Sequence, residues 1–307
     1  MNAVIIATLN RPRLLLNLLN HISQQKIKPD IIYISDASDP EFRIDLVKLK
    51  KLGLKVEYEF SAIKSAAIQR NNLLRKISKQ VNYVSVLDDD LGLANDYFEK
   101  VYSFFRTHDC IGCSGITNDS QRINFVKKFR ILRILKRLFL LDSSKQGSVT
   151  AAGVNVPYSK APDSAMQVQW LIGCSNWDMN KVRELEYPNT FKGQSLFEDV
   201  IFSLKAGKKG KLFVAPDIRF DHFLSPIERP NNIIFYKMWI QNRFFVLNEI
   251  PNRLKYLAFH WANLGKLIQI ILTIIFNPKL NSEKLFGIIQ GYYSLSIYLL
   301  KKYAKKN

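Results

Sequence analysis

Acidic residues are scarce in this sequence. Its 307 residues include 26 Asp and Glu but 45 Lys and Arg, which gives a formal net charge of +19. A chain this basic favours anionic partners, above all nucleic acid or the surface of an anionic membrane. The hydrophobic fraction of 47% supports a packed core, and the length fits one large α/β domain with an elaboration, or two small domains.

Cysteine is also scarce. Cys110, Cys113 and Cys174 are an odd number with no disulfide framework, which fits a reducing compartment. Cys110 and Cys113 have the spacing of metal ligands, but zinc takes four ligands and the chain has no second such pair. We therefore interpret this segment as a buried strand with small residues.

Long apolar runs and a targeting signal are missing as well. Residues 267–276 and 285–300 are hydrophobic, yet each run is shorter than the roughly 20 residues that a membrane-spanning helix needs. Residues 1–3 lead directly into a predicted strand, without the basic region or cleavage pattern of a signal peptide. We expect a cytoplasmic protein, associated peripherally with the inner face of the cell membrane through an interfacial or re-entrant tail.

The excess positive charge is concentrated in two segments. Residues 126–160 contain 8 Lys and Arg against 1 Asp, and residues 231–307 contain 11 against 2. Residues 1–125, with 17 against 14, and residues 161–230, with 9 against 9, are close to neutral. The basic surface is therefore expected on elements added to the main body.

The first basic segment contains a predicted amphipathic helix near residues 126–141. At 100° per residue, Arg130, Arg133, Lys136 and Arg137 fall on one side and the aliphatic residues of 131–139 on the other. Such a helix either lies in the interface of an anionic membrane or packs its apolar side on the protein. The apolar, basic C-terminal segment favours the membrane.

Strands and helices alternate over the first ninety residues. Apolar runs at 4–8, 31–35, 56–60 and 83–87 predict strands, and helical patterns follow the first three of them. This alternation predicts an α/β fold with a parallel sheet, whose ligands bind at the carboxyl ends of the strands. Thr8, Asp36 and the acidic run that begins at Asp88 are all expected at those ends.

Three consecutive carboxylates, Asp88, Asp89 and Asp90, end the fourth predicted strand. Adjacent carboxylates raise one another's pKa or require a cation. Mg²⁺ and Mn²⁺ prefer carboxylate oxygens and keep open positions for phosphates, so a divalent metal site is predicted. A solvated acidic turn is the alternative.

Four segments together resemble a known family. Residues 6–11, 34–39, 70–71 and 87–90 are similar in order and spacing to the nucleotide-sugar half of family 2 glycosyltransferases, inverting enzymes of the GT-A fold that include bacterial enzymes of cell-surface polysaccharide synthesis. The resemblance continues through Gly173, Glu198, Asp199 and His222. It implies a Rossmann-like, mostly parallel nucleotide-sugar half at 1–115 and an acceptor half at 116–230. Residues 231–307 lie outside the resemblance, and their basic, apolar composition predicts a helical membrane-associating tail.

The resemblance also implies roles for single residues. It makes Asp199 the catalytic base, Asp90 and His222 metal ligands for Mn²⁺ or Mg²⁺, and Trp170 and Glu198 acceptor-side residues. The implied donor-binding residues are Thr8, Arg11, Asp36, Arg70, Asp88, Asp89 and Gly173. Arginine donors suit phosphate, and glycine allows close backbone approach.

Structural alternatives stay open for several of these residues. Asp36 could simply begin a turn, and Arg70 could be a surface charge on its helix. Glu198 or Asp199 could serve only as an N-terminal helix cap, since carboxylates are stabilised there. His222 could be an ordinary loop or core histidine. Lys205 replaces the arginine that family members often carry after the acidic pair, which puts detailed acceptor contacts in doubt.

The resulting prediction is a metal-assisted, inverting glycosyltransferase that uses a UDP- or dTDP-sugar and a lipid-linked or cell-surface glycan precursor. A polyprenyl-phosphate sugar synthase is one alternative, in which the acceptor is a phosphate. A basic protein that binds nucleic acid or membrane without catalysis is the other. The aliphatic character of the basic segments and the lack of a nucleic-acid-binding motif disfavour nucleic acid as a partner.

Overall fold

The structure is a computed structural model that describes residues 1–117, 130–158, 162–223 and 231–304, apart from the side chains of Arg130 and Ile131. The chain forms two compact units. The first unit contains residues 1–126, 158–194 and 198–228, and the second contains residues 127–157, 195–197 and 229–307.

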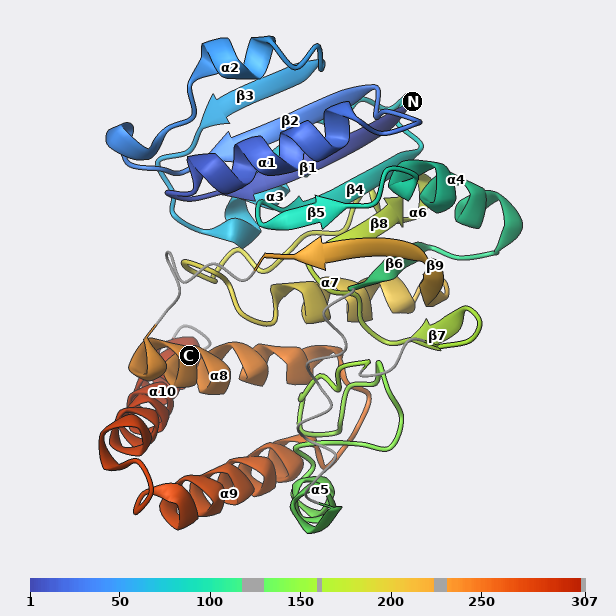
Figure 1. The fold of residues 1–307 in the computed structure, drawn as a ribbon. Helices are drawn as coiled ribbons and strands as arrows, with labels where there is room; N and C mark the ends of the chain where they lie inside the picture. The colour runs from blue at the N-terminus through green and yellow to red at the C-terminus, as the bar shows by residue number, and fades with distance from the viewer. Residues whose placement is uncertain (118–129, 159–161, 224–230, 305–307) are drawn as a thin grey trace. The chain divides into compact units, whose positions relative to one another are not determined.

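Strands and helices alternate along the first unit (Figure 1). Its elements are β1 Asn2–Thr8, α1 Pro12–Ser23, β2 Ile31–Asp36, η1 Pro40–Phe42, α2 Leu46–Lys50, β3 Val56–Phe60, α3 Ala66–Lys76, β4 Tyr83–Asp88, β5 Leu91–Leu93, α4 Tyr97–Thr107, β6 Gly112–Thr117, β7 Met166–Val168, β8 Cys174–Asp178, α6 Met179–Val182, α7 Glu198–Gly207 and β9 Leu212–His222. The helical pattern that follows the second predicted strand is instead split into η1 and α2. The split lies before Asp45, whose side chain accepts a hydrogen bond from Val47 N and begins α2 there.

The described strands form one mixed sheet in the order β3-β2-β1-β4-β8-β6-β9-β5, with β7 also paired to β9. β3, β2, β1 and β4 are parallel neighbours, and β8 is antiparallel to both β4 and β6. β9 is parallel to β6, while β5 and β7 are antiparallel to β9. Most strands therefore run in one direction, as the sequence predicted, with β5, β7 and β8 reversed.

Helices pack on both faces of this sheet. On one face, alternate residues of β1 and β2, such as Ile6 and Ile34, share a buried core with α1 and α4. On the other face, the Gln69 amide of α3 donates hydrogen bonds to the carbonyls of Thr8 and Ser35. Phe202 of α7 packs edge to face on Trp177 of β8. Both faces of the central strands are thus covered, which explains why these strands are nearly continuous apolar runs.

Two neighbouring loops fix the start of α1. Asn10 has a positive φ of 56°, and its backbone N–H donates to the Ser38 hydroxyl at 2.7 Å. The Asn10 side-chain oxygen accepts from Asp39 N at 2.9 Å. Pro12 then begins α1, where its missing N–H costs nothing. These bonds hold Arg11 at the carboxyl end of β1.

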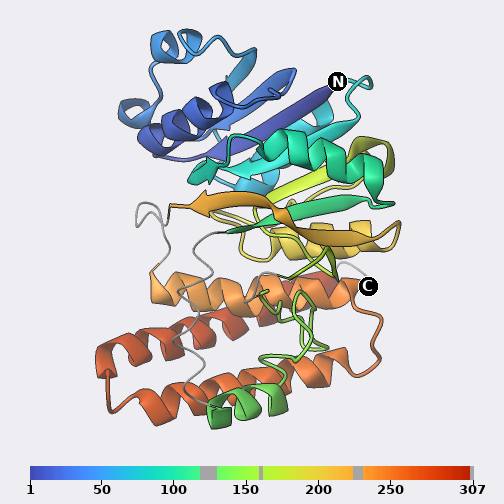
Figure 2. The same ribbon diagram turned by 45° about the vertical axis from the view of Figure 1, so that its right-hand side comes forward.

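The second unit consists mainly of helices (Figure 2). They are α5 Arg130–Leu138, α8 Asn232–Val246, η3 Leu247–Glu249, α9 Lys255–Thr273 and α10 Pro278–Ala304. Glycines let α10 pack closely on α8. A Cβ at Gly287 would lie 2.5 Å from the Ile233 carbonyl oxygen, and one at Gly291 would lie 2.7 Å from Ile240 Cβ.

The predicted apolar run 267–276 begins within α9, which ends at Thr273, and the run 285–300 lies within α10. No helix in the described part of the chain is long and apolar enough to cross a membrane. The amphipathic helix predicted near 126–141 is present as α5, while residues 126–129 lie outside the described residues. The side chain of Arg130 lies outside the description too.

Candidate active site

The parallel register brings the predicted polar residues to one edge of the sheet. Thr8 at the end of β1 pairs with Asp36 at the end of β2, and Ala7 pairs with Asp88 at the end of β4. β9 reaches the same edge because Leu91, which directly follows the acidic run, pairs with His222. The chain therefore returns 132 residues after Asp90 to place an imidazole beside the acids.

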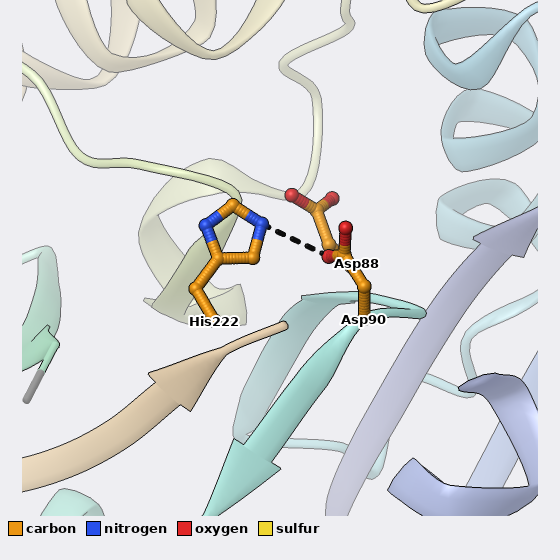
Figure 3. Close-up of side chains that lie close together, drawn as sticks. All are labelled: Asp88, Asp90 and His222. Carbon is orange, nitrogen blue, oxygen red and sulfur yellow. Dashed lines mark ion pairs between the residues drawn. The ribbon is translucent and has the colours of Figure 1, made fainter. Parts of the chain in front are cut away.

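Asp88, Asp90 and His222 form a cluster that fits a divalent metal. One ligand atom from each lies within 4.8 Å of the others, and His222 Nε2 is 3.0 Å from Asp90 Oδ1 (Figure 3). Ligands about 2.0–2.1 Å from a Mg²⁺ ion are at most roughly 4.2 Å apart, so small side-chain shifts would complete the geometry. Two carboxylates and one imidazole also suit Mn²⁺, and three protein ligands would leave positions open.

Asp89 is not a member of this cluster. Its Oδ2 accepts a 2.6 Å hydrogen bond from the Thr8 hydroxyl, and its Oδ1 is 3.1 Å from Arg11 Nη1. Burial raises the pKa of Asp89 to about 6, although Arg11 and Thr8 oppose the shift. The same Arg11 nitrogen is 3.5 Å from Asp90 Oδ2. Asp89 thus holds Arg11 beside the cluster.

Arg70 lies between two carboxylates. Its Nη2 is 2.5 Å from Asp88 Oδ1, and its Nη1 pairs with Glu198 at the start of α7. Although burial alone would lower the pKa of Arg70, the Glu198 and Asp88 carboxylates raise it above its usual value. This arrangement excludes the reading of Arg70 as a surface charge, while a phosphate contact by Arg70 stays a prediction.

Asp36 is buried and accepts two hydrogen bonds. The Tyr58 hydroxyl donates to Oδ2 at 2.5 Å, and Ser38 N donates to Oδ1 at 2.8 Å. The second bond is the one that the turn alternative predicts. Tyr58 was not among the predicted site residues. It could have been found from β3, where the alternation Val56, Tyr58, Phe60 puts Tyr58 on one face with its parallel partner Ile34.

Gly173 closely approaches the acidic run. Asp88 N donates a 3.0 Å hydrogen bond to the Gly173 carbonyl, which joins the end of β4 to the start of β8. A Cβ on Gly173 would collide with the Asp88 carboxylate, because it would lie only 2.7 Å from Cγ and 2.8 Å from Oδ1. Only glycine leaves room for Asp88 in this position.

Asp199 lies in the first turn of α7. Its Oδ1 accepts a 2.8 Å hydrogen bond from Val200 N. Burial raises the pKa of Asp199 to about 6, and the Asp88 carboxylate adds to this shift while Arg70 opposes it. Asp199 is therefore within electrostatic range of the metal-type cluster. Of the two acids that begin α7, Glu198 is committed to the ion pair with Arg70, which leaves Asp199 as the candidate base.

Trp170 is buried beside Tyr158, which, like Tyr58, was not among the predicted site residues. The centroids of the Trp170 and Tyr158 rings are 5.6 Å apart. Burial raises the pKa of Tyr158, and the Asp199 carboxylate contributes to the same shift. Tyr158 therefore approaches the Asp199 side of the site. No local pattern marks it, since it follows the irregular segment after α5.

The fold and the edge cluster together define a glycosyltransferase of the GT-A class. The glycosyl transferase family 2 model matches residues 3–165, more than half of the chain, and the chain belongs to this family. A comparison with curated protein sequences gave no match. The family, the GT-A fold and the enzyme class expected from the sequence are confirmed.

Solved structures share this fold at low identity. S. aureus TarS 1–349 in complex with UDP-GlcNAc is 13% identical, with a TM-score of 0.60 over 93% of this chain and 79% of that TarS 1–349 chain. The mannosyltransferase PcManGT from Pyrobaculum calidifontis, solved with GDP-Man and Mn²⁺, is 12% identical, with a TM-score of 0.57 over 95% of this chain and 87% of the other. GalNAc-T7 with UDP, GalNAc and Mn²⁺ is 11% identical, with a TM-score of 0.56 over 87% and 55%.

Proposed function

We propose that this enzyme transfers a sugar, with inversion, from a nucleoside diphosphate to an acceptor hydroxyl, assisted by a divalent metal. The carrying observation is the convergence of Asp88, Asp90 and His222 at one sheet edge, with Asp199 in electrostatic range. The ligands of the similar structures, UDP-GlcNAc in TarS and GDP-Man with Mn²⁺ in PcManGT, support a nucleotide-sugar donor.

Asp90 and His222 are the proposed metal ligands. Asp88 is either the third metal ligand or a contact for the ribose of the nucleotide. When bound, Mn²⁺ or Mg²⁺ would supply Lewis-acid stabilisation of the departing diphosphate. Arg11 stands 3.5 Å from Asp90, so its planar donors can add to the positive field on the same phosphates. Thr8 and Asp89 fix that arginine, and Arg70 fixes Asp88 from the other side.

Asp199 is the proposed general base. A single displacement needs an ionised carboxylate that takes the proton of the acceptor hydroxyl as the new bond forms. With a pKa of about 6, Asp199 is mostly ionised at neutral pH and still basic enough to accept that proton. Glu198, locked to Arg70, positions the turn that carries it.

Asp36 is the proposed contact for the nucleotide. Its carboxylate is fixed by Tyr58 and by the turn at Ser38, at the same edge as the acidic run. A carboxylate held in this way can accept hydrogen bonds from the N–H of a pyrimidine base or from ribose hydroxyls. This supports a UDP- or dTDP-sugar as donor.

The acceptor is proposed to be a lipid-linked precursor of a cell-surface glycan, used at the inner membrane surface. The apolar side chains of α5 are exposed, with Ile134 at 58% and Leu138 at 59%, whereas Arg133 and Lys136 are half-buried. The outer side of α9 likewise exposes Leu257 and Leu272, at 67% and 66%. Exposed apolar residues on basic helices fit an anionic membrane interface better than internal packing.

Thermal denaturation of the purified chain tests the donor and metal assignments. UDP or dTDP should raise Tm in the presence of Mn²⁺ and much less in EDTA, because a ligand stabilises in proportion to the logarithm of its concentration over Kd. Asp90→Ala should lose the Mn²⁺-dependent increase and keep the ligand-free Tm within a few degrees. Equal nucleotide stabilisation of Asp90→Ala and wild type in Mn²⁺ would remove Asp90 from the metal site.

A further inference from the structure

Four cations of the second unit, one from each of its longer helices, are close enough that three of them repel the fourth, Lys266. They are Lys136 of α5, Arg243 of α8, Lys266 of α9 and Lys284 of α10. Lys266 lies on the inner side of α9, between the buried residues Ala262 and Ile270. None of the four forms an ion pair with a carboxylate among the described residues, as the salt bridges of this unit involve other side chains.

The helix contacts explain this proximity. Trp261 Nε1 donates a 2.8 Å hydrogen bond to the Leu138 carbonyl, so the end of α5 abuts α9 one turn before Lys266. Lys266 Nζ lies 5.6 Å from the ring centroid of Tyr236 on α8. On α10, a Cβ at Gly287 would lie 2.9 Å from Tyr236 Cβ. Tyr236 of α8 therefore lies against both Lys266 of α9 and Gly287 of α10.

Arg243 is the most unusual of these cations. Its side chain is completely buried, and its guanidinium lies 3.5 Å from the ring centroid of Trp239 and 4.6 Å from that of Phe259. One nitrogen, Nη2, donates to Asn263 Oδ1, whereas Nε and Nη1 have no hydrogen-bond partner. A buried charge without a counter-ion is costly, so such cations are normally paired.

The pKa values of Lys266 and Arg243 are those of cations without an anionic partner. Burial lowers the pKa of Lys266 to about 8, and repulsion from Lys136, Lys284 and Arg243 adds to the shift. Burial also lowers the pKa of Arg243. An anion placed among these groups would reverse both effects, because an opposite charge favours the protonated form.

We infer that Lys136, Lys266 and Lys284, with Arg243 behind them, form a binding site for a phosphate or diphosphate group. The three lysines are half-buried and supply N–H donors, while Arg243 adds positive field from the interior. Inorganic phosphate or diphosphate is one source of such a group, and a phosphorylated isoprenoid lipid is the other. The lipid source rests on the proposed function, and the exposed apolar side chains of α9 favour it.

Calorimetric titration of the full chain with diphosphate, and with farnesyl phosphate in neutral detergent, tests the site. Lys266→Met should weaken binding about tenfold or more, the effect of losing one charge-assisted contact. It should also raise the ligand-free Tm, since it removes a buried, repelled charge. Lys279→Met, an exposed position on the same helix as Lys284, is the matched control and should change neither property.

The outcomes separate the two sources and the two proposals. Binding of farnesyl phosphate much tighter than of diphosphate assigns a lipid ligand, and comparable binding assigns a free phosphate group. Binding of neither ligand, or equal binding by Lys266→Met and wild type, overturns the site. UDP binding in Mn²⁺, measured on the same Lys266→Met protein, should be unchanged. If wild type itself did not bind UDP in Mn²⁺, the proposed function would be refuted, whereas the phosphate site would not be affected.

Discussion

Replacement of Gly173 by alanine tests how tightly the acidic run is packed. The new methyl group would overlap the Asp88 carboxylate, whose Cγ lies 2.7 Å from the Cβ position. The backbone has little freedom to yield, because Asp88 N bonds to the Gly173 carbonyl and Leu87 pairs with Cys174 across the two strands. The Asp88 side chain is 35% exposed and can rotate away.

Gly173→Ala should therefore weaken metal binding more than it lowers the stability of the fold. Overpacking a core costs about 1–3 kcal/mol, and rotation of Asp88 relieves part of that strain. The same rotation breaks the 2.5 Å pair with Arg70 and moves Asp88 away from Asp90 and His222. Loss of a partner that only supports a ligand typically lowers metal affinity about 10–100-fold, so displacement of Asp88 itself should lower it at least as much.

The assay is Mn²⁺ titration of UDP-dependent thermal stabilisation, with unfolding by denaturant as the stability measurement. Gly207→Ala is the matched control, because a Cβ at this last residue of α7 meets nothing within 4 Å. It should leave both Mn²⁺ affinity and stability close to wild type. If Gly173→Ala kept wild-type Mn²⁺ affinity, Asp88 would play no part in the metal site, and the reasoning from its packing would fail.

Two further predictions concern the base and the membrane. Asp199→Asn should keep UDP and Mn²⁺ affinity but slow transfer at least about 10²-fold, with an inverted product in wild type. The acidic limb of the pH profile of wild-type kcat/KM should have a pKa of about 6 or lower, because activity rises as Asp199 ionises and a bound cation would lower the pKa of Asp199 further. A product with retained configuration, or the same acidic limb in Asp199→Asn, would show that Asp199 is not the base. Reversal of Arg130, Arg133 and Arg137 to Glu should weaken the affinity for anionic liposomes, measured by sedimentation, at least about 100-fold, since each of the lost positive charges contributes ~1 kcal/mol. Neutral liposomes are the control, and unchanged sedimentation would return α5 to the packed alternative.

The sheet edge could be predicted because its signals are local. Each early strand is a short apolar run that ends in a polar turn, and parallel strands end together, so Thr8, Asp36 and Asp88 had to be neighbours. His222 followed from the same rule at the end of β9. The reversal of β8 between β4 and β6 has no local signal, because the alternation of side chains along a strand is the same in either direction.

The pairing of the charged residues could not be predicted. Arg70 meets Glu198 across 128 residues of sequence, and Tyr58 meets Asp36 across a strand pair. Such contacts depend on side-chain direction in the packed structure, which periodicity does not give. The same limit applies to Arg243, since one arginine in a segment rich in lysine gives no sign in the sequence that its guanidinium will lie against two aromatic rings.

The acidic run itself shows how repulsion alone can mislead. Each of its three carboxylates already faces a cation or a donor: Asp88 meets Arg70, Asp89 meets Thr8 and Arg11, and Asp90 meets His222. Arginines thus supply much of the charge balance that three adjacent acids demand, and their adjacency does not by itself require a metal. The positions of the side chains support a metal site more strongly. Asp89 is bonded to Thr8 and Arg11, whereas Asp88 and Asp90, alternate residues of the run, lie with the His222 imidazole from β9 close enough together to hold one ion.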